Sequence, residues 1–127
     1  MVFVIFIEGV LGPVLIKEFR FGHIVINGKA YSQDVVIAKN KVCPFWWRKE
    51  KYKVDWRDLS CFLKKDVEIL IIGTGTCGLL KPTPVLQEKL KEKGIEIITL
   101  PTKEAVRIFN HEYYAGKAVL GAFHLTY

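Results

Sequence analysis

The sequence lacks the residue patterns that mark several classes of protein. Its three cysteines, Cys43, Cys61 and Cys77, are an odd number without a C-x-x-C pair, which argues against a disulfide framework or a cysteine zinc site and favours the reducing cytosol. Its histidines form no H-x-x-x-H or H-E-x-x-H spacing, so we expect no metal site. No G-x-S-x-G elbow or other catalytic constellation is recognised. The sequence therefore predicts no catalytic residues and no cofactor.

An apolar run long enough to cross a membrane is also missing. The N-terminal run from Val2 to Ile16 is interrupted between positions 8 and 13 by glutamate, glycine and proline, and no basic residues precede it as they would in a signal peptide. Residues 1–18 are therefore interpreted as an N-terminal extension, strand or hairpin, and no Arg- and Ser-rich mitochondrial targeting segment is found. We expect a cytoplasmic protein without a membrane span.

Length and composition fit one globular domain. With 127 residues, 50% of them hydrophobic, the chain can bury a core of its own, and we assign residues 19–127 to a single domain. The formal net charge of +6 comes from lysines spread along the chain, which argues for solubility more than for nucleic-acid binding. Lysine and glutamate are frequent whereas glutamine is scarce, a balance typical of hyperthermophile proteins.

The first half of the domain is rich in β-strand signals. The pair Asn27-Gly28 is the strongest short hairpin signal, and residues 31–37 are expected as the returning strand. Residues 42–56 hold three tryptophans among basic residues and are interpreted as a loop or edge strand. A short helix near residues 58–64 should follow, with either Asp55 or Asp58 as its N-cap.

The second half predicts a β-α-β-α-β unit. Its first strand is almost continuously apolar, as expected of a strand covered on both faces, and a crossover helix requires the first two strands to be parallel. The expected elements are a strand over 67–72, a helix begun by Thr83 and Pro84 and closed by Gly94, a strand over 95–100, a helix capped by Thr102 and closed by Gly116, and a strand over 118–125.

A glycine-rich turn follows the first strand of this unit. Its spacing, Gly73-x-Gly75-x-x-Gly78, is that of the dinucleotide-binding fingerprint. Two details argue against that cofactor. Pro82 and Pro84 delay the helix until well after the third glycine, and the acidic residue expected about 20 residues later is missing.

A weaker hypothesis is an anion or small-molecule site at this turn. Helix N-termini that follow parallel strands open at the carboxyl edge of the sheet, where unpaired N–H groups favour an anion. The alternative is that the glycines only permit a tight turn and the threonines only cap helices. The candidate anion site consists of Gly73, Thr74, Gly75, Thr76, Thr102 and Lys103.

The segment Trp46-Trp47-Arg48 is a candidate partner surface, because tryptophan and arginine dominate binding hot spots and also stack on bases. Adjacent residues of an extended segment point to opposite faces, so one of the two tryptophans is expected in the core. His124, in the last strand, is either an acid or base at the carboxyl edge or a structural histidine. Cys77 is interpreted as a small residue of a tight loop.

An ordered set of short motifs resembles a known family from about Phe19 to Leu125. The motifs are Phe21-Gly22, Ile26-Asn27-Gly28, Asp34-Val35-Val36-Ile37, Trp46-Trp47-Arg48, Asp58-Leu59, Ile72-Gly73-Thr74-Gly75, Glu92-Lys93-Gly94 and Pro101-Thr102-Lys103-Glu104-Ala105. The sequence with these motifs resembles the small domain family that includes mitochondrial complex I assembly factor three and an adipogenesis-associated protein named for an archaeal founder from Methanothermobacter.

The resemblance implies a three-layer α/β fold with a mixed central sheet, and an archaeal member of a family that is mostly uncharacterised. One eukaryotic relative acts as an assembly factor that binds other proteins without known catalysis, which is an analogy of family rather than of site. Three hypotheses follow. The first is a non-catalytic interaction or assembly protein with an unidentified protein partner. The second is an anion or small-molecule binder, or an uncharacterised enzyme, with its site at the glycine-rich turn and the N-termini of the following helices. The third is a nucleic-acid binder, ranked last.

Overall fold

The structure, a computed structural model, describes residues 13–127 of the chain. The interpretation of the N-terminal run as a strand or hairpin concerns residues 1–12 for the most part, which lie outside the described residues. From Ile16 onward the chain forms β-structure in its first half and a β-α-β-α-β succession in its second.

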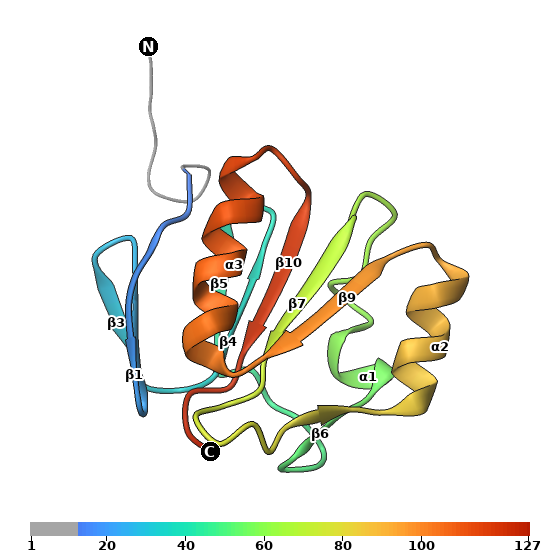
Figure 1. Cartoon of the computed structure of the whole chain (residues 1–127), viewed down its shortest axis with the longest axis horizontal. Helices are drawn as coiled ribbons and strands as arrows, with labels where there is room; N and C mark the ends of the chain where they lie inside the picture. The colour runs from blue at the N-terminus through green and yellow to red at the C-terminus, as the bar shows by residue number, and fades with distance from the viewer. Residues whose placement is uncertain (1–12) are drawn as a thin grey trace.

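The centre of the fold is a mixed five-stranded sheet (Figure 1). Three neighbouring strands pair in parallel. Two more strands extend the sheet on one side, and each of them pairs antiparallel with the strand next to it. This confirms the predicted α/β class with a mixed sheet. It also confirms the parallel pairing expected of the first two strands of the β-α-β-α-β unit. In spatial order the strands are β5 (Lys41–Pro44), β4 (Val35–Ala38), β10 (Val119–Phe123), β7 (Ile69–Gly73) and β9 (Glu96–Leu100).

A separate three-stranded antiparallel sheet precedes it, made of β1 (Ile16–Arg20), β2 (His23–Ile26) and β3 (Lys29–Tyr31). Asn27 and Gly28, with φ of 52° and 80°, form the expected hairpin turn between β2 and β3. The predicted returning strand over 31–37 was wrong, because β3 ends at Tyr31 and the chain then crosses to β4 in the central sheet.

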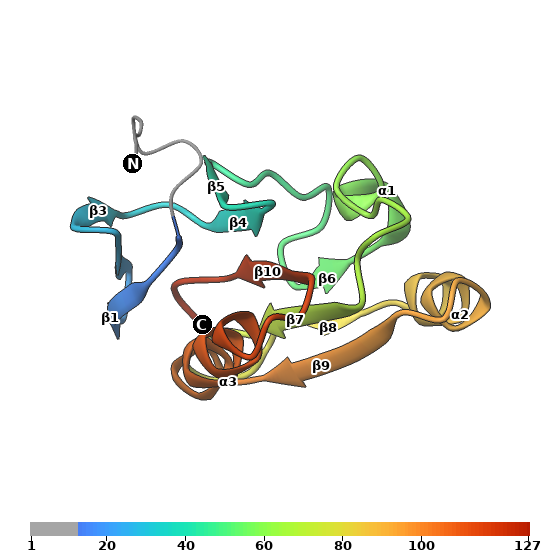
Figure 2. The same cartoon turned by 90° about the horizontal axis from the view of Figure 1, so that it is seen from above.

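The helices and the small sheets cover both faces of the central sheet. Seen from above, α3 (Thr102–Tyr114) lies on one side of the sheet, and α1 (Trp56–Leu59) lies on the other (Figure 2). The helix α2 (Pro84–Glu92) packs beside β9, and the short strands β6 (Lys53–Val54) and β8 (Lys81–Pro82) pair in parallel below it.

Each face of the sheet has its own hydrophobic core because successive side chains of a strand point in opposite directions. Ile69 and Ile71 of β7 pack with α3, β1 and β2, whereas Leu70 and Ile72 pack with α1 and α2. A strand buried on both faces must be apolar at nearly every position, which is why β7 reads as a continuous apolar run.

Helix capping agrees with the sequence at two helices and differs at the third. Asp55 and Asp58 form a reciprocal capping box at α1, and the Thr83 side chain accepts the N–H of Leu86 at the start of α2. The helix expected near 58–64 instead spans Trp56–Leu59. The predicted cap at Thr102 was wrong, since Pro101 occupies the N-cap and the Thr102 hydroxyl bonds elsewhere.

The packing between α3 and the sheet is tight at Gly121 of β10. An added Cβ there would lie 2.8 Å from Cδ1 of Phe109 and 2.7 Å from Cε2 of Phe123, both of which are fully buried rings. The absence of a side chain at this position therefore lets α3 approach the middle of the sheet.

We predict that Gly121→Ala lowers the free energy of unfolding by about 1–3 kcal/mol through overpacking. Urea unfolding measures the loss. Phe109→Leu in the same chain should recover part of it, because the ring that meets the new methyl group is removed. Equal stability of Gly121→Ala and wild type would contradict this account of the contact.

Candidate functional site

A buried ionic cluster lies at the carboxyl edge of the parallel strands and consists of Asp34, Arg48 and His124. Nη1 of Arg48 donates to Oδ2 of Asp34 at 2.8 Å, and Nδ1 of His124 lies 2.7 Å from the same oxygen. The other carboxylate oxygen accepts the main-chain N–H of Leu125 at 2.8 Å. The three side chains are between 5% and 16% exposed, so this Asp34 cluster is almost closed to solvent.

Each member of the Asp34 cluster comes from a different part of the chain. Asp34 precedes β4, Arg48 belongs to the segment after β5, and His124 follows β10. Nη2 of Arg48 also donates to the carbonyl of Lys51, and Nε is buried without a hydrogen-bond partner among the described residues. The cluster therefore fixes the loop after β5 against the edge of the sheet.

The charges of the cluster support one another. Burial acts to raise the pKa of Asp34, but hydrogen bonds from His124, the Leu125 N–H and Arg48, together with the charge of His124, outweigh it and hold the pKa below 3.8. Asp34 is therefore ionised at neutral pH and balances the buried guanidinium of Arg48.

The two adjacent tryptophans point in opposite directions, as predicted. Trp46 is buried, its indole N–H donates to the carbonyl of Asp58, and the guanidinium of Arg48 lies 4.7 Å from its ring centroid. Trp47 is 76% exposed. Of the three residues predicted as a partner surface, only Trp47 therefore presents its side chain to solvent, and Trp46 and Arg48 hold it there.

An exposed aromatic residue that sequence reasoning did not single out lies beside Trp47. Phe45 is 73% exposed and separates two hollows. One, of about 350 Å³, is lined by Cys43, Trp46, Trp47, Arg57 and Phe62 among others. The other, of about 200 Å³, is lined by residues 29–33, Pro44 and Phe45. We call Phe45, Trp47 and the larger hollow between them the aromatic surface.

The backbone of Phe45 is in the left-handed region, with φ of 60°. This conformation costs a bulky residue roughly 1–2 kcal/mol, and glycine or asparagine would adopt it more cheaply. The turn brings the Trp46 N–H to the carbonyl of Asp34 at 2.8 Å, but it does not require an aromatic side chain. An exposed phenylalanine at a strained position is unexplained by folding.

Most of the net charge of the protein lies in the segment of the chain that carries the aromatic surface. Residues 41–65 contain eight basic and three acidic residues, a net charge of +5 within a chain of +6. Lysines do occur along the whole chain, as the composition indicated, but outside this segment nearby acidic residues nearly cancel them. The segment is therefore basic as well as aromatic, and its Arg57 lines the larger hollow.

The glycine-rich turn lies at the same sheet edge, and its N–H groups are bonded within the chain. The N–H of Thr76 donates to the carbonyl of Thr126, and those of Cys77 and Leu79 donate to the main-chain oxygen of Tyr127. Gly75, with φ of 96°, needs both the left-handed conformation and the lack of a Cβ that would lie 2.6 Å from the Tyr127 oxygen. The turn is therefore hydrogen-bonded to, and tightly packed against, the segment that follows β10.

The other residues of the candidate anion site divide between the interior and the surface. Gly73, Thr74 and Thr102 are buried, whereas Thr76 and Lys103 are exposed. The Thr102 hydroxyl donates to the carbonyl of His124 at 2.6 Å and accepts the N–H of Gly75 at 2.8 Å. The structure therefore brings these residues to one edge, and their role as an anion site stays a prediction.

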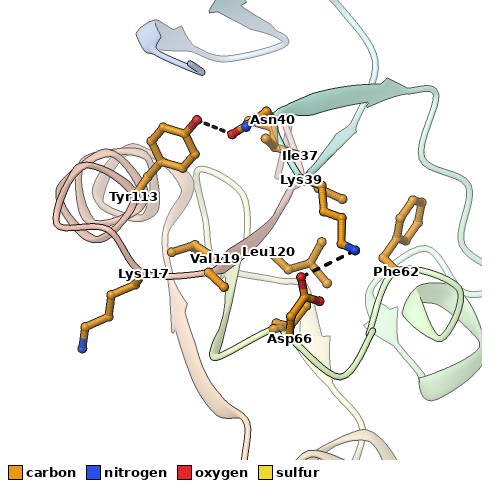
Figure 3. A pocket seen from close by; sticks show the side chains of 12 residues that line it. Ile37, Lys39, Asn40, Phe62, Asp66, Tyr113, Lys117, Val119 and Leu120 are labelled. Atoms are coloured by element: carbon orange, nitrogen blue, oxygen red, sulfur yellow. Dashed lines mark hydrogen bonds and ion pairs between the residues drawn. The ribbon is translucent and has the colours of Figure 1, made fainter. Parts of the chain in front are cut away.

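A further pocket of about 260 Å³ lies at the opposite end of the sheet (Figure 3). Its floor is apolar, and the polar side chains on its rim bind one another. The Tyr113 hydroxyl points to Asn40, Nζ of Lys39 points to Asp66 at 3.5 Å, and Lys117 points away from the pocket. Among the described residues, this pocket offers no free charged group that would select a ligand.

Fold and site together define a small α/β domain whose aromatic surface is held in place by the buried Asp34 cluster. The chain belongs to the family described as protein of unknown function (DUF498/DUF598), which matches residues 16–124. This confirms the resemblance at the level of a family of unknown function.

Solved structures share the fold over nearly the whole chain. The conserved hypothetical protein PH1505 from Pyrococcus horikoshii OT3 is 30% identical, with a TM-score of 0.74 over 88% of this chain and 98% of that chain. An outer membrane protein from Bartonella henselae is 23% identical, with a TM-score of 0.78 over 93% and 99%. The second likeness shows the fold alone.

A curated relative, the 13 kDa major membrane protein of Francisella tularensis subsp. holarctica (strain LVS), is 22% identical over 104 residues, which are 81% of this chain and 84% of the relative. In this chain, the helices formed by residues 13–127 are too short or too polar to cross a bilayer. The relatives come from several organisms, so the family by itself does not indicate the source of this protein.

We predict that Asp34→Asn lowers the free energy of unfolding by about 3–5 kcal/mol at neutral pH, because it leaves the Arg48 guanidinium buried without a counter-charge. The pKa of Asp34 is lowered in the folded state, so its contribution is present above pH 3.8 and is lost as the pH falls through the folded pKa. The difference between variant and wild type, measured by urea unfolding, should therefore shrink in acid.

Asp66→Asn is the matched control, since the ion pair of Asp66 with Lys39 is exposed and is worth about 0–1 kcal/mol. Equal losses for the two variants at neutral pH would show that the Asp34 cluster does not stabilise the fold.

We also predict that Gly75→Ala destabilises the protein more than Gly22→Ala. Both positions have a positive φ and share the cost of the left-handed conformation, but only the Cβ at Gly75 would meet the chain, whereas nothing lies within 4 Å at Gly22. Amide exchange of Thr76 and Cys77 should quicken in Gly75→Ala alone. Similar effects of the two substitutions would show that the Tyr127 backbone does not pack tightly against Gly75.

Proposed function

We propose that this protein is a non-catalytic interaction protein that binds a protein partner through the aromatic surface. The observation that carries the proposal is the pair Phe45 and Trp47, both more than two thirds exposed, on either side of an apolar hollow. Large exposed aromatic residues at the rim of a hollow are typical of binding hot spots.

The energetics of this surface support a role in binding. Two features that folding disfavours, an aromatic ring in water and a bulky residue in the left-handed region, coincide at Phe45. The Asp34 cluster and the buried Trp46 hold the same segment rigidly, which lowers the entropy that a partner's binding must overcome.

The family resemblance supports the same role, because the assembly factor within it acts by binding other proteins. We place the interaction in the cytoplasm, since the three cysteines, Cys43, Cys61 and Cys77, are free and fit a reducing compartment. Assembly of a larger complex is one form that such an interaction takes.

We predict that the double variant Phe45→Asn, Trp47→Ala keeps wild-type stability within about 0.5 kcal/mol but loses partner binding. Asparagine tolerates the left-handed backbone, so the turn is preserved while both rings are removed. Affinity capture from an extract of the source organism, quantified by mass spectrometry, compares the double variant with wild type.

Tyr114→Ala is the control, because Tyr114 is an exposed aromatic residue on α3, outside the aromatic surface. Proteins enriched by wild type and by Tyr114→Ala but absent from the double variant would support the proposal. An identical set of captured proteins from wild type, Tyr114→Ala and the double variant would contradict the proposal.

A further inference from the structure

The exposed charged residues of the segment that carries the aromatic surface, residues 41–65, are almost all positive. Lys41, Lys49, Lys51, Lys53 and Arg57 are exposed, and they lie within the segment that carries +5 of the net charge. Arg57 lines the larger hollow, and the main-chain N–H of Lys49 donates to Asp58, which lines it as well.

The acidic residues of the segment are mostly engaged in the fold. Asp58 is 8% exposed and accepts the N–H groups of Lys49 and Asp55, while Asp55 caps α1 and accepts the Thr83 hydroxyl. Glu50 is the one acidic residue of 41–65 classed as exposed. The positive potential at the surface is therefore only weakly offset, and it favours a negatively charged partner.

The hollow between Phe45 and Trp47 is largely apolar. Its lining includes Val36, Cys43, Pro44 and Phe62, beneath the two exposed rings. Burial in such a place stabilises an apolar side chain, whereas a phosphodiester would lose hydration there. Single-stranded nucleic acids favour open stacking platforms along a basic groove, so this shape favours a protein segment instead.

The neighbouring sheet edge is a poor template for an added strand. The edge strand β5 has only four residues, begins with Lys41 and ends with Pro44, which has no N–H to donate. A partner is therefore held by side chains placed in the hollow and by charges around it, not by extension of the central sheet.

From these observations we infer that the aromatic surface binds an acidic protein segment that inserts an apolar side chain between Phe45 and Trp47. The inference rests on the proposed interaction role and adds the chemistry of the partner. Aspartate and glutamate residues on both sides of the anchor side chain meet exposed basic residues such as Lys49 and Arg57, and the anchor fills the apolar hollow.

A display selection with random 12-residue peptides on the immobilised full-length protein tests this chemistry. We expect the enriched peptides to contain several Asp or Glu residues around one apolar residue, and to be lost in a parallel selection on Phe45→Asn, Trp47→Ala. The best peptide should bind about tenfold more weakly to Lys49→Ser, Arg57→Ser at low salt, because two facing charges are removed. Added salt should reduce that difference.

The matched control is Lys91→Ser, Arg107→Ser, which removes two exposed basic residues from the charge-balanced half of the chain and should leave affinity unchanged within about twofold. Neutral or basic peptides that depend on Phe45 and Trp47 would overturn the acidic partner while leaving the interaction role intact. Peptides that bind the double variant as tightly as the wild type would overturn the acidic partner and the interaction role together. Tighter binding of a 12-nucleotide oligo-dT than of any selected peptide would assign the surface to nucleic acid.

Discussion

The Asp34 carboxylate is the interaction on which the arrangement of the carboxyl edge depends. It binds the Arg48 guanidinium, the His124 ring and the Leu125 N–H, and so joins the chain before β4 to the segments that follow β5 and β10, just beyond the hydrogen-bonded ends of these strands. A buried cation and a buried anion each need the other, since either alone would be strongly destabilising. The position of the segment that carries Trp46 and Trp47 therefore follows from one charge balance inside the protein.

This arrangement links the interior to the outer surface. With Arg48 held inward and Trp46 packed under it, the alternation of an extended chain leaves Trp47 outside, and the left-handed turn at Phe45 directs a second ring to solvent. The apolar hollow between them is bounded by α1 and β5, which are parts of the folded domain. A preformed surface of this kind suits recognition, because its residues lose little conformational entropy when a partner binds.

Local signals in the sequence predicted much of the fold, and long-range contacts account for what they missed. The pair Asn27-Gly28, the cap at Thr83 and the apolar run of β7 each depend on neighbours in sequence, and each was confirmed. The Asp34 cluster could not be predicted in this way, because its members lie 14, 76 and 90 residues apart. The basic character of residues 41–65 was present in the sequence, but it becomes clear only when acidic residues are subtracted segment by segment.

The segment that follows β10 gives the glycine-rich turn a ligand from within the chain. Main-chain oxygens of Thr126 and Tyr127 accept the N–H groups of Thr76, Cys77 and Leu79, the kind of donors that an anion would use. A tethered ligand acts at an effective concentration of the order of millimolar. Any free anion that entered this turn would therefore act as a competitor of the protein's own backbone, and its apparent affinity would be lowered by that competition.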